Sequence, residues 1–173
     1  EVKHFYVLYD ASLSMNEITK KRLSNKIFGT VLNELQPQDS VSLFIYSQDM
    51  KAIASNKGIQ KEKMTEIFEN VKNEGYTDGY QAIYKTLKSA NSSLFEGKKI
   101  VIIITDGAFN LNSGQITSIL SQDMTKNMQV TIVGIVPSKW AKQDLKLLAK
   151  DLGGHYQGIE SENAATTFSL ESR

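Results

Sequence analysis

The segment that decides the fold reads HFYVLYDASLS and occupies residues 4–14. Residues 4–9 carry aromatic and aliphatic side chains on both faces, which is the pattern of a β-strand buried on both sides. Asp10, Ser12 and Ser14 follow at alternate positions directly after it. A buried strand that ends in oxygen-bearing side chains indicates a parallel α/β sheet with a binding site beyond the carboxyl end of the strand.

The rest of the chain alternates strand and helix patterns. Residues 41–46, 100–104 and 130–136 repeat the pattern of a strand buried on both faces. Between and after them, apolar residues recur at helical spacing in six stripes: Ile27, Val31 and Leu35; Met64, Ile67, Phe68 and Val71; Ile83, Leu87, Ala90 and Leu94; Ile116, Ile119 and Leu120; Ala141, Leu145, Leu148 and Leu152; Ala164, Ala165 and Phe168. This alternation predicts an α/β fold with an open, mostly parallel sheet and helices on both faces. Residues 51–54 follow the second strand too closely for a parallel crossover and are predicted to form an antiparallel edge strand.

Composition is that of one ordinary globular domain, with 40% hydrophobic and 23% charged residues among 173. Twenty Lys and Arg against nineteen Asp and Glu give a formal net charge of +1, which argues against a nucleic-acid partner. The longest aliphatic run, residues 100–104, is too short to cross a bilayer, so we expect no membrane insertion by this domain. Because the chain opens on Glu1 and not on Met, we expect residues 1–173 to be a single domain taken from a longer protein.

Three oxygen-rich loops are expected on the carboxyl edge of the sheet. The first strand ends in the Asp10 turn, the strand of residues 100–104 ends in Thr105-Asp106-Gly107, and residues 75–79 (GYTDG) precede a helix. Together they offer two carboxylates and three hydroxyls, with no His or Cys among them. This is a hard-oxygen set that suits Mg²⁺ or a similar divalent ion. The predicted ligands are Asp10, Ser12, Ser14, Thr77 and Asp106.

These motifs resemble the metal-ion-dependent adhesion site of von Willebrand factor type A (vWA) domains, which has an Asp-x-Ser-x-Ser turn, a later Thr and a later Asp. The resemblance spans nearly the whole chain and implies a three-layer, Rossmann-like fold. In that fold a six-stranded sheet of order 3-2-1-4-5-6 has one antiparallel edge strand. It also implies Mg²⁺ or Mn²⁺ as the ion, with Ca²⁺ ranked below them. Leu13 and Gly79 depart from the residues usual in the family, at positions that are not ligands.

The resemblance implies a non-enzymatic module that binds a protein partner, which supplies an Asp or Glu side chain to the ion. The rim around the ion is expected to set specificity and comprises Leu13, Tyr76, Tyr80, Phe109 and Asn110. The family also favours a cell-envelope or extracellular location over the cytoplasm, and a bacterial source.

Simpler interpretations stand beside the metal site. Ser14 and Glu17 fit a capping box that opens a helix, and Asp106-Gly107 alone is an ordinary turn. Lys20 and Lys21 are interpreted as part of a solvated face, and Trp140 is expected to pack at a helix start.

The alternative function is a Mg²⁺-dependent phosphatase or phosphotransferase with Asp10 as nucleophile. Such phosphatases resemble one another in an Asp-x-Asp turn, in which the second acid donates a proton. This chain has Ser12 at that second position, which disfavours the enzymatic function.

Overall fold

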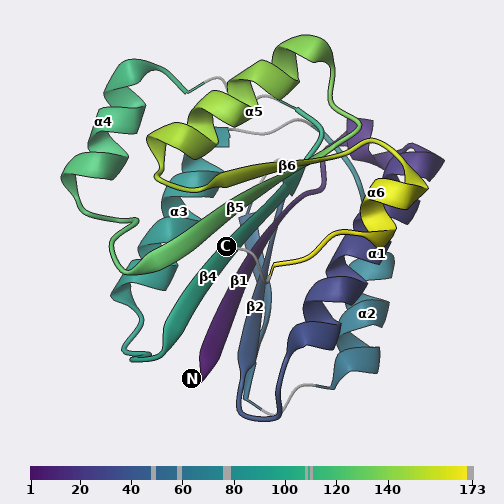
Figure 1. Cartoon of the computed structure of the whole chain (residues 1–173), viewed down its shortest axis with the longest axis horizontal. Coiled ribbons are helices and arrows are strands. Elements are labelled where there is room, and N and C mark those ends of the chain that lie inside the picture. The colour runs from purple at the N-terminus through teal and green to yellow at the C-terminus, as the bar shows by residue number, and fades with distance from the viewer. Residues whose placement is uncertain (48–49, 58–59, 76–78, 108, 110, 171–173) are drawn as a thin grey trace.

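A six-stranded sheet with helices on both faces forms the domain in the computed structural model (Figure 1). The structure describes residues 1–47, 50–57, 60–75, 79–107, 109 and 111–170. The strands are β1 (Lys3–Asp10), β2 (Ser40–Tyr46), β3 (Met50–Lys57), β4 (Lys98–Thr105), β5 (Met128–Ile135) and β6 (His155–Ile159). The helices are α1 (Ile18–Glu34), α2 (Lys61–Glu69), α3 (Gly79–Ser92), α4 (Ser113–Ser121), α5 (Lys139–Asp151) and α6 (Glu162–Thr166), with a 3-10 turn η1 (Leu13–Asn16) before α1.

The strands lie in the order β3-β2-β1-β4-β5-β6, which confirms the predicted topology. β3 is antiparallel to β2, and the other neighbouring pairs are parallel. Tyr9 is in register with Ile45 on one side and with Ile104 on the other. Because β1 and β4 run in parallel and end together, Asp10 emerges beside Thr105 and Asp106 at the carboxyl edge of the sheet.

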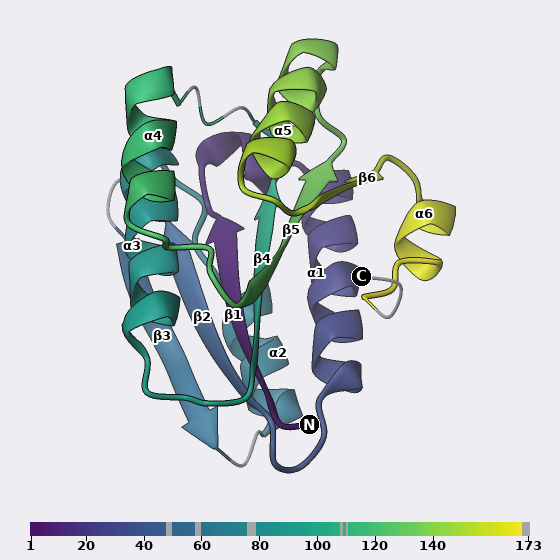
Figure 2. The same cartoon turned by 60° about the vertical axis from the view of Figure 1, so that its left-hand side comes forward.

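Both faces of the sheet are buried, as the sequence of the first strand predicts. Phe5, Val7 and Tyr9 of β1 belong to a core that α1, α2 and α6 cover. Tyr6 and Leu8 belong to a second core that is covered by α3, α4 and α5. The two groups of helices lie on opposite sides of the sheet in Figures 1 and 2. Each side chain of β1 from Phe5 to Tyr9 therefore meets a helix layer.

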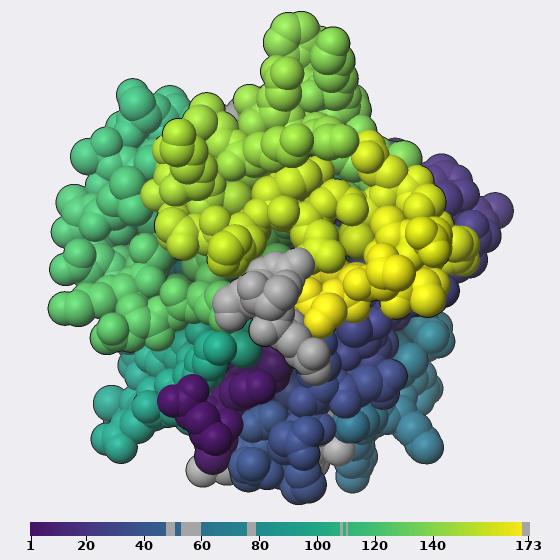
Figure 3. All heavy atoms as spheres, in the orientation of Figure 1, coloured from purple at the N-terminus to yellow at the C-terminus, as the bar shows by residue number. Residues whose placement is uncertain are grey.

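The C-terminal segment closes one side of the first core. α6 packs against α1, where Arg22 Nε lies 2.8 Å from Glu162 Oε1. Phe168 and Leu170, which follow α6, are buried in the core beneath it. Figure 3 shows this yellow segment lying against the blue surface of α1.

The predicted helical stripe that ends at Leu94 extends beyond its helix into an exposed residue. α3 ends at Ser92, and the side chain of Leu94 is 95% exposed instead of packed. The amine of Lys99 lies at this end, where its Nζ donates to the carbonyl oxygens of Ala90 (2.6 Å) and of Ser93 (3.1 Å), which follows the helix. Lys99 thus satisfies carbonyl groups that the end of the helix leaves without backbone partners.

Candidate metal centre

Asp10 is the last residue of β1 and is almost fully buried, with 4% exposure. Its Oδ1 accepts a hydrogen bond from the backbone N–H of Ser12 (2.9 Å), and its Oδ2 accepts one from the Thr105 hydroxyl (2.6 Å). Burial raises the pKa of Asp10 above its usual value, while the hydrogen bonds from Ser12 and Thr105 act in the opposite direction. The negative charge of Asp106 adds to the rise in this pKa. Asp10 is thus a carboxylate whose ionised form gains from a nearby cation.

The serines of the turn lead from Asp10 to Asp106. Ser12 Oγ lies 3.1 Å from Ser14 Oγ, and Ser14 Oγ donates to Asp106 Oδ1 at 3.0 Å. Ser12 directly precedes the 3-10 turn η1 of residues 13–16, and Ser14 is the second residue of that turn. Four of the five predicted ligands therefore gather at the carboxyl ends of β1 and β4.

The fifth predicted ligand, Thr77, lies outside the described residues, as do the rim residues Tyr76 and Asn110. Glu74 and Gly75, which precede Tyr76 and Thr77 in the sequence, adjoin the Asp10 turn. The N–H of Leu13 donates to the carbonyl of Gly75 (3.1 Å), and the N–H of Glu74 donates to the carbonyl of Ala11 (2.9 Å). Two backbone hydrogen bonds thus join the first loop to the segment that leads into the second.

Lys20 is a member of the site that the sequence analysis missed. Its Nζ lies 2.7 Å from Asp106 Oδ2, and the Lys20 side chain is only 21% exposed. Lys21 also has a protein partner, since its Nζ donates to the carbonyl of Val71 at 3.2 Å. The interpretation of both lysines as a solvated face was wrong. Lys20 lies in the first turn of the helix that follows the Asp10 turn, and this position was the available signal.

The predicted capping box between Ser14 and Glu17 was also wrong. Glu17 itself caps α1, with its carboxylate accepting from the N–H groups of Thr19 (3.0 Å) and Lys20 (3.1 Å). These bonds, that of Thr19 foremost, lower the pKa of Glu17. Because Glu17 satisfies the free N–H groups of the helix, the Ser14 hydroxyl is left to bind Asp106.

Thr105 is a second residue that the predicted ligand set omits. It ends β4, is 1% exposed, and its Oγ1 also accepts from the N–H of Gly107 at 3.1 Å. The hydroxyl therefore links Asp10 on β1 to the turn that carries Asp106. It fixes the spacing of the two carboxylate-bearing loops.

The described rim residues differ in how they face solvent. The side chain of Leu13 is 63% exposed beside the serines, and Tyr80 is half-buried, with its hydroxyl 3.5 Å from Ser118 Oγ. Phe109 is 9% exposed, and its ring lies 5.7 Å from that of Tyr46. Leu13 thus presents the most exposed apolar surface of the three.

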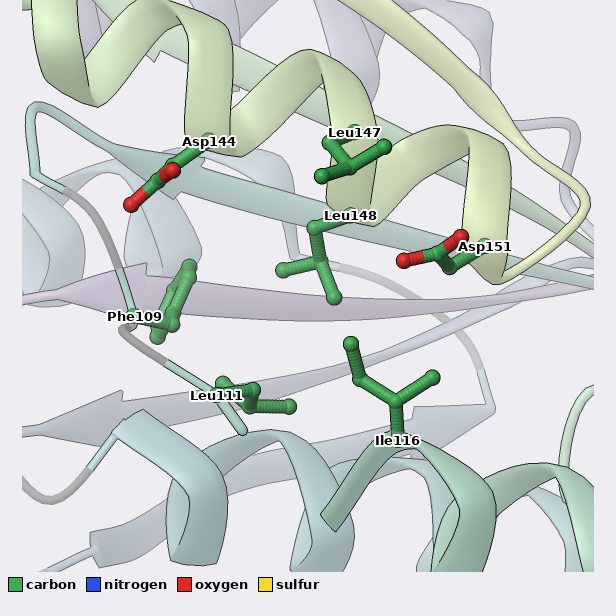
Figure 4. Close-up of a pocket in the computed structure, with 7 residues that line it drawn as sticks. All are labelled: Phe109, Leu111, Ile116, Asp144, Leu147, Leu148 and Asp151. Carbon is green, nitrogen blue, oxygen red and sulfur yellow. The ribbon is translucent and has the colours of Figure 1, made fainter. Parts of the chain in front are cut away.

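Phe109 also borders a cavity of about 70 Å³ between α4 and α5. Figure 4 shows Phe109 and Leu111 on the loop before α4, facing Leu148 of α5 and Ile116 of α4. The loop that begins at Asp106 is therefore packed into the second core three residues later. This packing holds the Asp106 turn against the sheet.

The donor chemistry fits a hard divalent cation. Among the described residues there is no group of three or more His, Cys, Asp or Glu side chains placed to hold a metal. A cation here would depend on two carboxylates together with the Ser12 and Ser14 hydroxyls and water, which is a set that Mg²⁺ accepts. The contact of the Lys20 ammonium with Asp106 shows that the site accommodates positive charge.

Fold and site together define a Rossmann-like α/β domain with an oxygen-lined site at the ends of its two central strands. The sequence profile of the von Willebrand factor type A domain matches residues 5–171. The chain therefore belongs to the vWA domain family, as its motifs predict. Members of this family are commonly adhesion or protein-interaction modules.

Solved structures share this fold at low sequence identity. A von Willebrand factor type A protein from Catenulispora acidiphila superposes with a TM-score of 0.73 at 15% identity, over 94% of this chain and 40% of that one. The conserved hypothetical protein BatB from Bacteroides thetaiotaomicron gives 0.72 at 17% identity, over 94% and 92%. The pilus adhesin SpaC from Lactobacillus rhamnosus GG gives 0.72 at 13% identity, over 94% and 28%. The chain thus spans well under half the length of the first and third of these proteins.

No curated protein sequence matches the chain significantly. Among the described residues, none of the helices has the length and apolar character needed to span a membrane.

Proposed function

We propose that this vWA domain binds a protein partner through a divalent cation, Mg²⁺ or Mn²⁺, held by Asp10, Ser12, Ser14, Thr77 and Asp106. The observation that carries the proposal is the hydrogen-bonded group formed by the first three of these residues and Asp106. It brings two carboxylates and two hydroxyls from distant parts of the chain to one edge of the sheet. A structural turn alone would not need Asp10 to be buried there as an acid.

The charges of the site favour an acidic group on the partner. Asp10 and Asp106 carry two negative charges between them, and the hydroxyl ligands add none. A bound dication supplies Lewis acidity at a coordination position that these residues leave to solvent or to a partner. If Asp106 acts through water, the ion is short of direct anionic donors, and a carboxylate from the partner is the ligand that it draws in most strongly. The rim, with Leu13 as its exposed apolar member, would pack beside that contact.

The residues favour binding over catalysis. Ser12 stands two positions after Asp10, and its hydroxyl is a poor general acid at neutral pH. Three of the structural neighbours are a pilus adhesin from Lactobacillus rhamnosus GG, the PilB minor pilin from Streptococcus sanguinis and an aerotolerance-related membrane protein from Bacteroides fragilis. We extend that setting to this chain and propose a non-enzymatic role in the cell envelope or outside the cell.

Metal binding is tested by calorimetric titration of the domain with Mg²⁺. Asp10→Asn is expected to abolish the binding, because it removes a buried negative charge while keeping the shape of the side chain. Asp123→Asn is the matched control. Asp123 is an exposed carboxylate in the turn before β5, at the opposite edge of the sheet, and its positive φ of 51° is one that Asn accepts readily. Unchanged Mg²⁺ binding in Asp10→Asn would refute the site.

Partner binding is tested with the immobilised domain and a cell-envelope extract in Mg²⁺ or in a chelator. Captured protein should be released by the chelator and lost in Thr77→Ala, while the domain stays folded by circular dichroism. Capture that survives both changes would show that the partner binds elsewhere.

A further inference from the structure

Lys20 forms an ion pair that differs from the others made by the described residues. The Lys20 and Asp106 side chains are 21% and 6% exposed, with 2.7 Å between Nζ and Oδ2. In the remaining ion pairs of the described residues, every side chain is at least 35% exposed. Exposed pairs contribute little to stability, whereas loss of one partner of a buried pair leaves an uncompensated charge. The contact between Lys20 and Asp106 is therefore the ion pair with the largest expected consequence.

Asp106 is at the same time a ligand in the proposed metal site. Its Oδ1 accepts from Ser14 and its Oδ2 accepts from Lys20, so both oxygens are engaged within the protein. A dication bound between Asp10 and Asp106 would lie within a few ångströms of the Lys20 ammonium, and two cations at that distance repel strongly in a partly buried site. The ammonium and the dication therefore compete for one carboxylate.

We propose that Lys20 is an internal competitor of the metal ion. It neutralises Asp106 when no divalent cation is bound, and it leaves Asp106 when one binds. This inference rests on the metal-dependent function proposed above and concerns the regulation of that site. It assigns to Lys20 the role of setting how much Mg²⁺ the site requires.

The position of Lys20 allows this exchange without a change in the fold. Lys20 is the third residue of α1, and its flexible four-carbon stem ends at a partly solvated position. Glu17, one turn earlier, is an exposed carboxylate close enough for the charge of Lys20 to contribute to its lowered pKa. An ammonium released from Asp106 thus has water and a second carboxylate within reach of the same backbone.

The consequence is a site whose affinity is lower than its oxygen ligands alone would give. Binding of the dication must break an ion pair already made, so occupancy should follow the free Mg²⁺ concentration instead of remaining permanent. The same ion pair keeps Asp106 neutralised at low Mg²⁺. The domain therefore stays folded without the metal ion, while partner binding follows the free Mg²⁺ concentration.

The test compares Mg²⁺ affinity by calorimetry in Lys20→Gln and Lys21→Gln. Both variants remove one positive charge from adjacent positions of α1, and Gln matches Lys in helix propensity. Lys21, whose amine bonds the Val71 carbonyl, controls for the general loss of charge. Lys20→Gln should bind Mg²⁺ on the order of tenfold more tightly than Lys21→Gln. Without Mg²⁺, Lys20→Gln should melt at a lower temperature than the wild type. Addition of Mg²⁺ should raise the melting temperature of this variant by more than it raises that of the wild type.

The outcomes separate this inference from the function on which it rests. Equal affinities in the two variants would overturn the inference alone. Absence of Mg²⁺ binding in the wild type and in both variants would overturn the proposed function, and the inference with it.

Nitrogen-15 NMR of the lysine side chains provides a measurement on the wild type, in case Lys20→Gln does not fold. The Lys20 Nζ resonance, assigned with Lys20→Arg, should be protected from exchange without Mg²⁺ and lose that protection on titration. A resonance unchanged at saturating Mg²⁺ would overturn the inference.

Discussion

Gly79 is predicted to be a position where one methyl group disturbs the fold next to the proposed metal site. It begins α3, and its backbone lies against Phe109 of the loop that follows Asp106. A Cβ atom at residue 79 would lie 2.4 Å from Phe109 Cδ1, 2.9 Å from its Cβ and 3.0 Å from its Cα. The ring could rotate away from the first contact, but the other two distances can increase only if the backbone of the loop moves.

The expected cost follows from these distances. Overpacking of a well-packed contact costs about 1–3 kcal/mol. Replacement of Gly by Ala offsets part of this cost by about 0.4–1 kcal/mol, because Ala lowers the conformational entropy of the unfolded chain. Gly79→Ala should therefore lower the free energy of unfolding by about 1–2 kcal/mol and the melting temperature by roughly 2–8 °C for a domain of this size. Because Phe109 follows Asp106 by three residues, Mg²⁺ binding should weaken as well.

Urea denaturation of four variants tests this reasoning. Gly29→Ala is the matched control, because it makes the same change in α1, where a Cβ would meet nothing within 4 Å. That variant should be stabilised by about 0.5–1 kcal/mol. In a Phe109→Ala background, the loop is free to shift, and Gly79→Ala should cost less than about 0.5 kcal/mol. If Gly79→Ala is as stable as Gly29→Ala, the close contact with Phe109 does not constrain the loop and the argument fails.

Substitutions at three further positions are expected to separate the contributions of burial and charge. His4 has a pKa lowered to about 4, first by burial and then by the charge of Lys99. As the pH is lowered, the unfolded chain binds a proton at His4 near pH 6.5, whereas the folded chain binds it only near pH 4. The free energy of unfolding should therefore decrease by about 1–2 kcal/mol as the pH falls from 6.5 to 4, after allowance for partial exposure. His4→Gln should flatten the pH dependence of urea unfolding, and an unchanged slope would contradict this. In chelator, Asp10→Asn should be at least as stable as the wild type at pH 7, because burial raises the pKa of Asp10 and disfavours its charge; a lower urea midpoint would count against that. Thr105→Val should cost about 1–3 kcal/mol by removing the hydrogen bond to a buried carboxylate, and Thr105→Ser should restore most of it, as thermal melts would show.

The fold could be predicted because local patterns determine it almost completely. A strand buried on both faces needs apolar side chains at successive positions, and residues 5–9 supply them. The short link after β2 leaves only an antiparallel partner, which β3 provides. The order of strands followed from the resemblance to the vWA family, and the register of Tyr9 with Ile104 is what brings the two carboxylate loops together. These features depend on residues near one another in sequence or on a shared topology.

The missed features depend on contacts between distant residues or on position around a helix. Lys20 and Asp106 are 86 positions apart, and the position of Lys20 in the first turn after the Asp10 loop does not by itself identify Asp106 as its partner. Trp140 was expected to pack, yet its side chain is 81% exposed. The buried stripe of α5 passes through Ala141, Leu145 and Leu148, and Trp140 lies about 100° away from Ala141 around the helix. Apolar character alone was therefore a poor guide there, because the spacing of its neighbours determines which face is buried.

The site itself explains why one set of residues can serve both stability and recognition. Each of the four carboxylate oxygens of Asp10 and Asp106 accepts a hydrogen bond or an ion pair from Ser12, Thr105, Ser14 or Lys20. Buried carboxylates without such partners would cost the domain several kcal/mol. A dication that binds here must therefore replace interactions that the protein already makes. Its affinity reflects the difference in free energy between carboxylates bound to the metal ion and carboxylates bound to the protein's own donors. A site built in this way can lose its ion without losing its fold, which is the property that a reversible, ion-dependent contact with a partner requires.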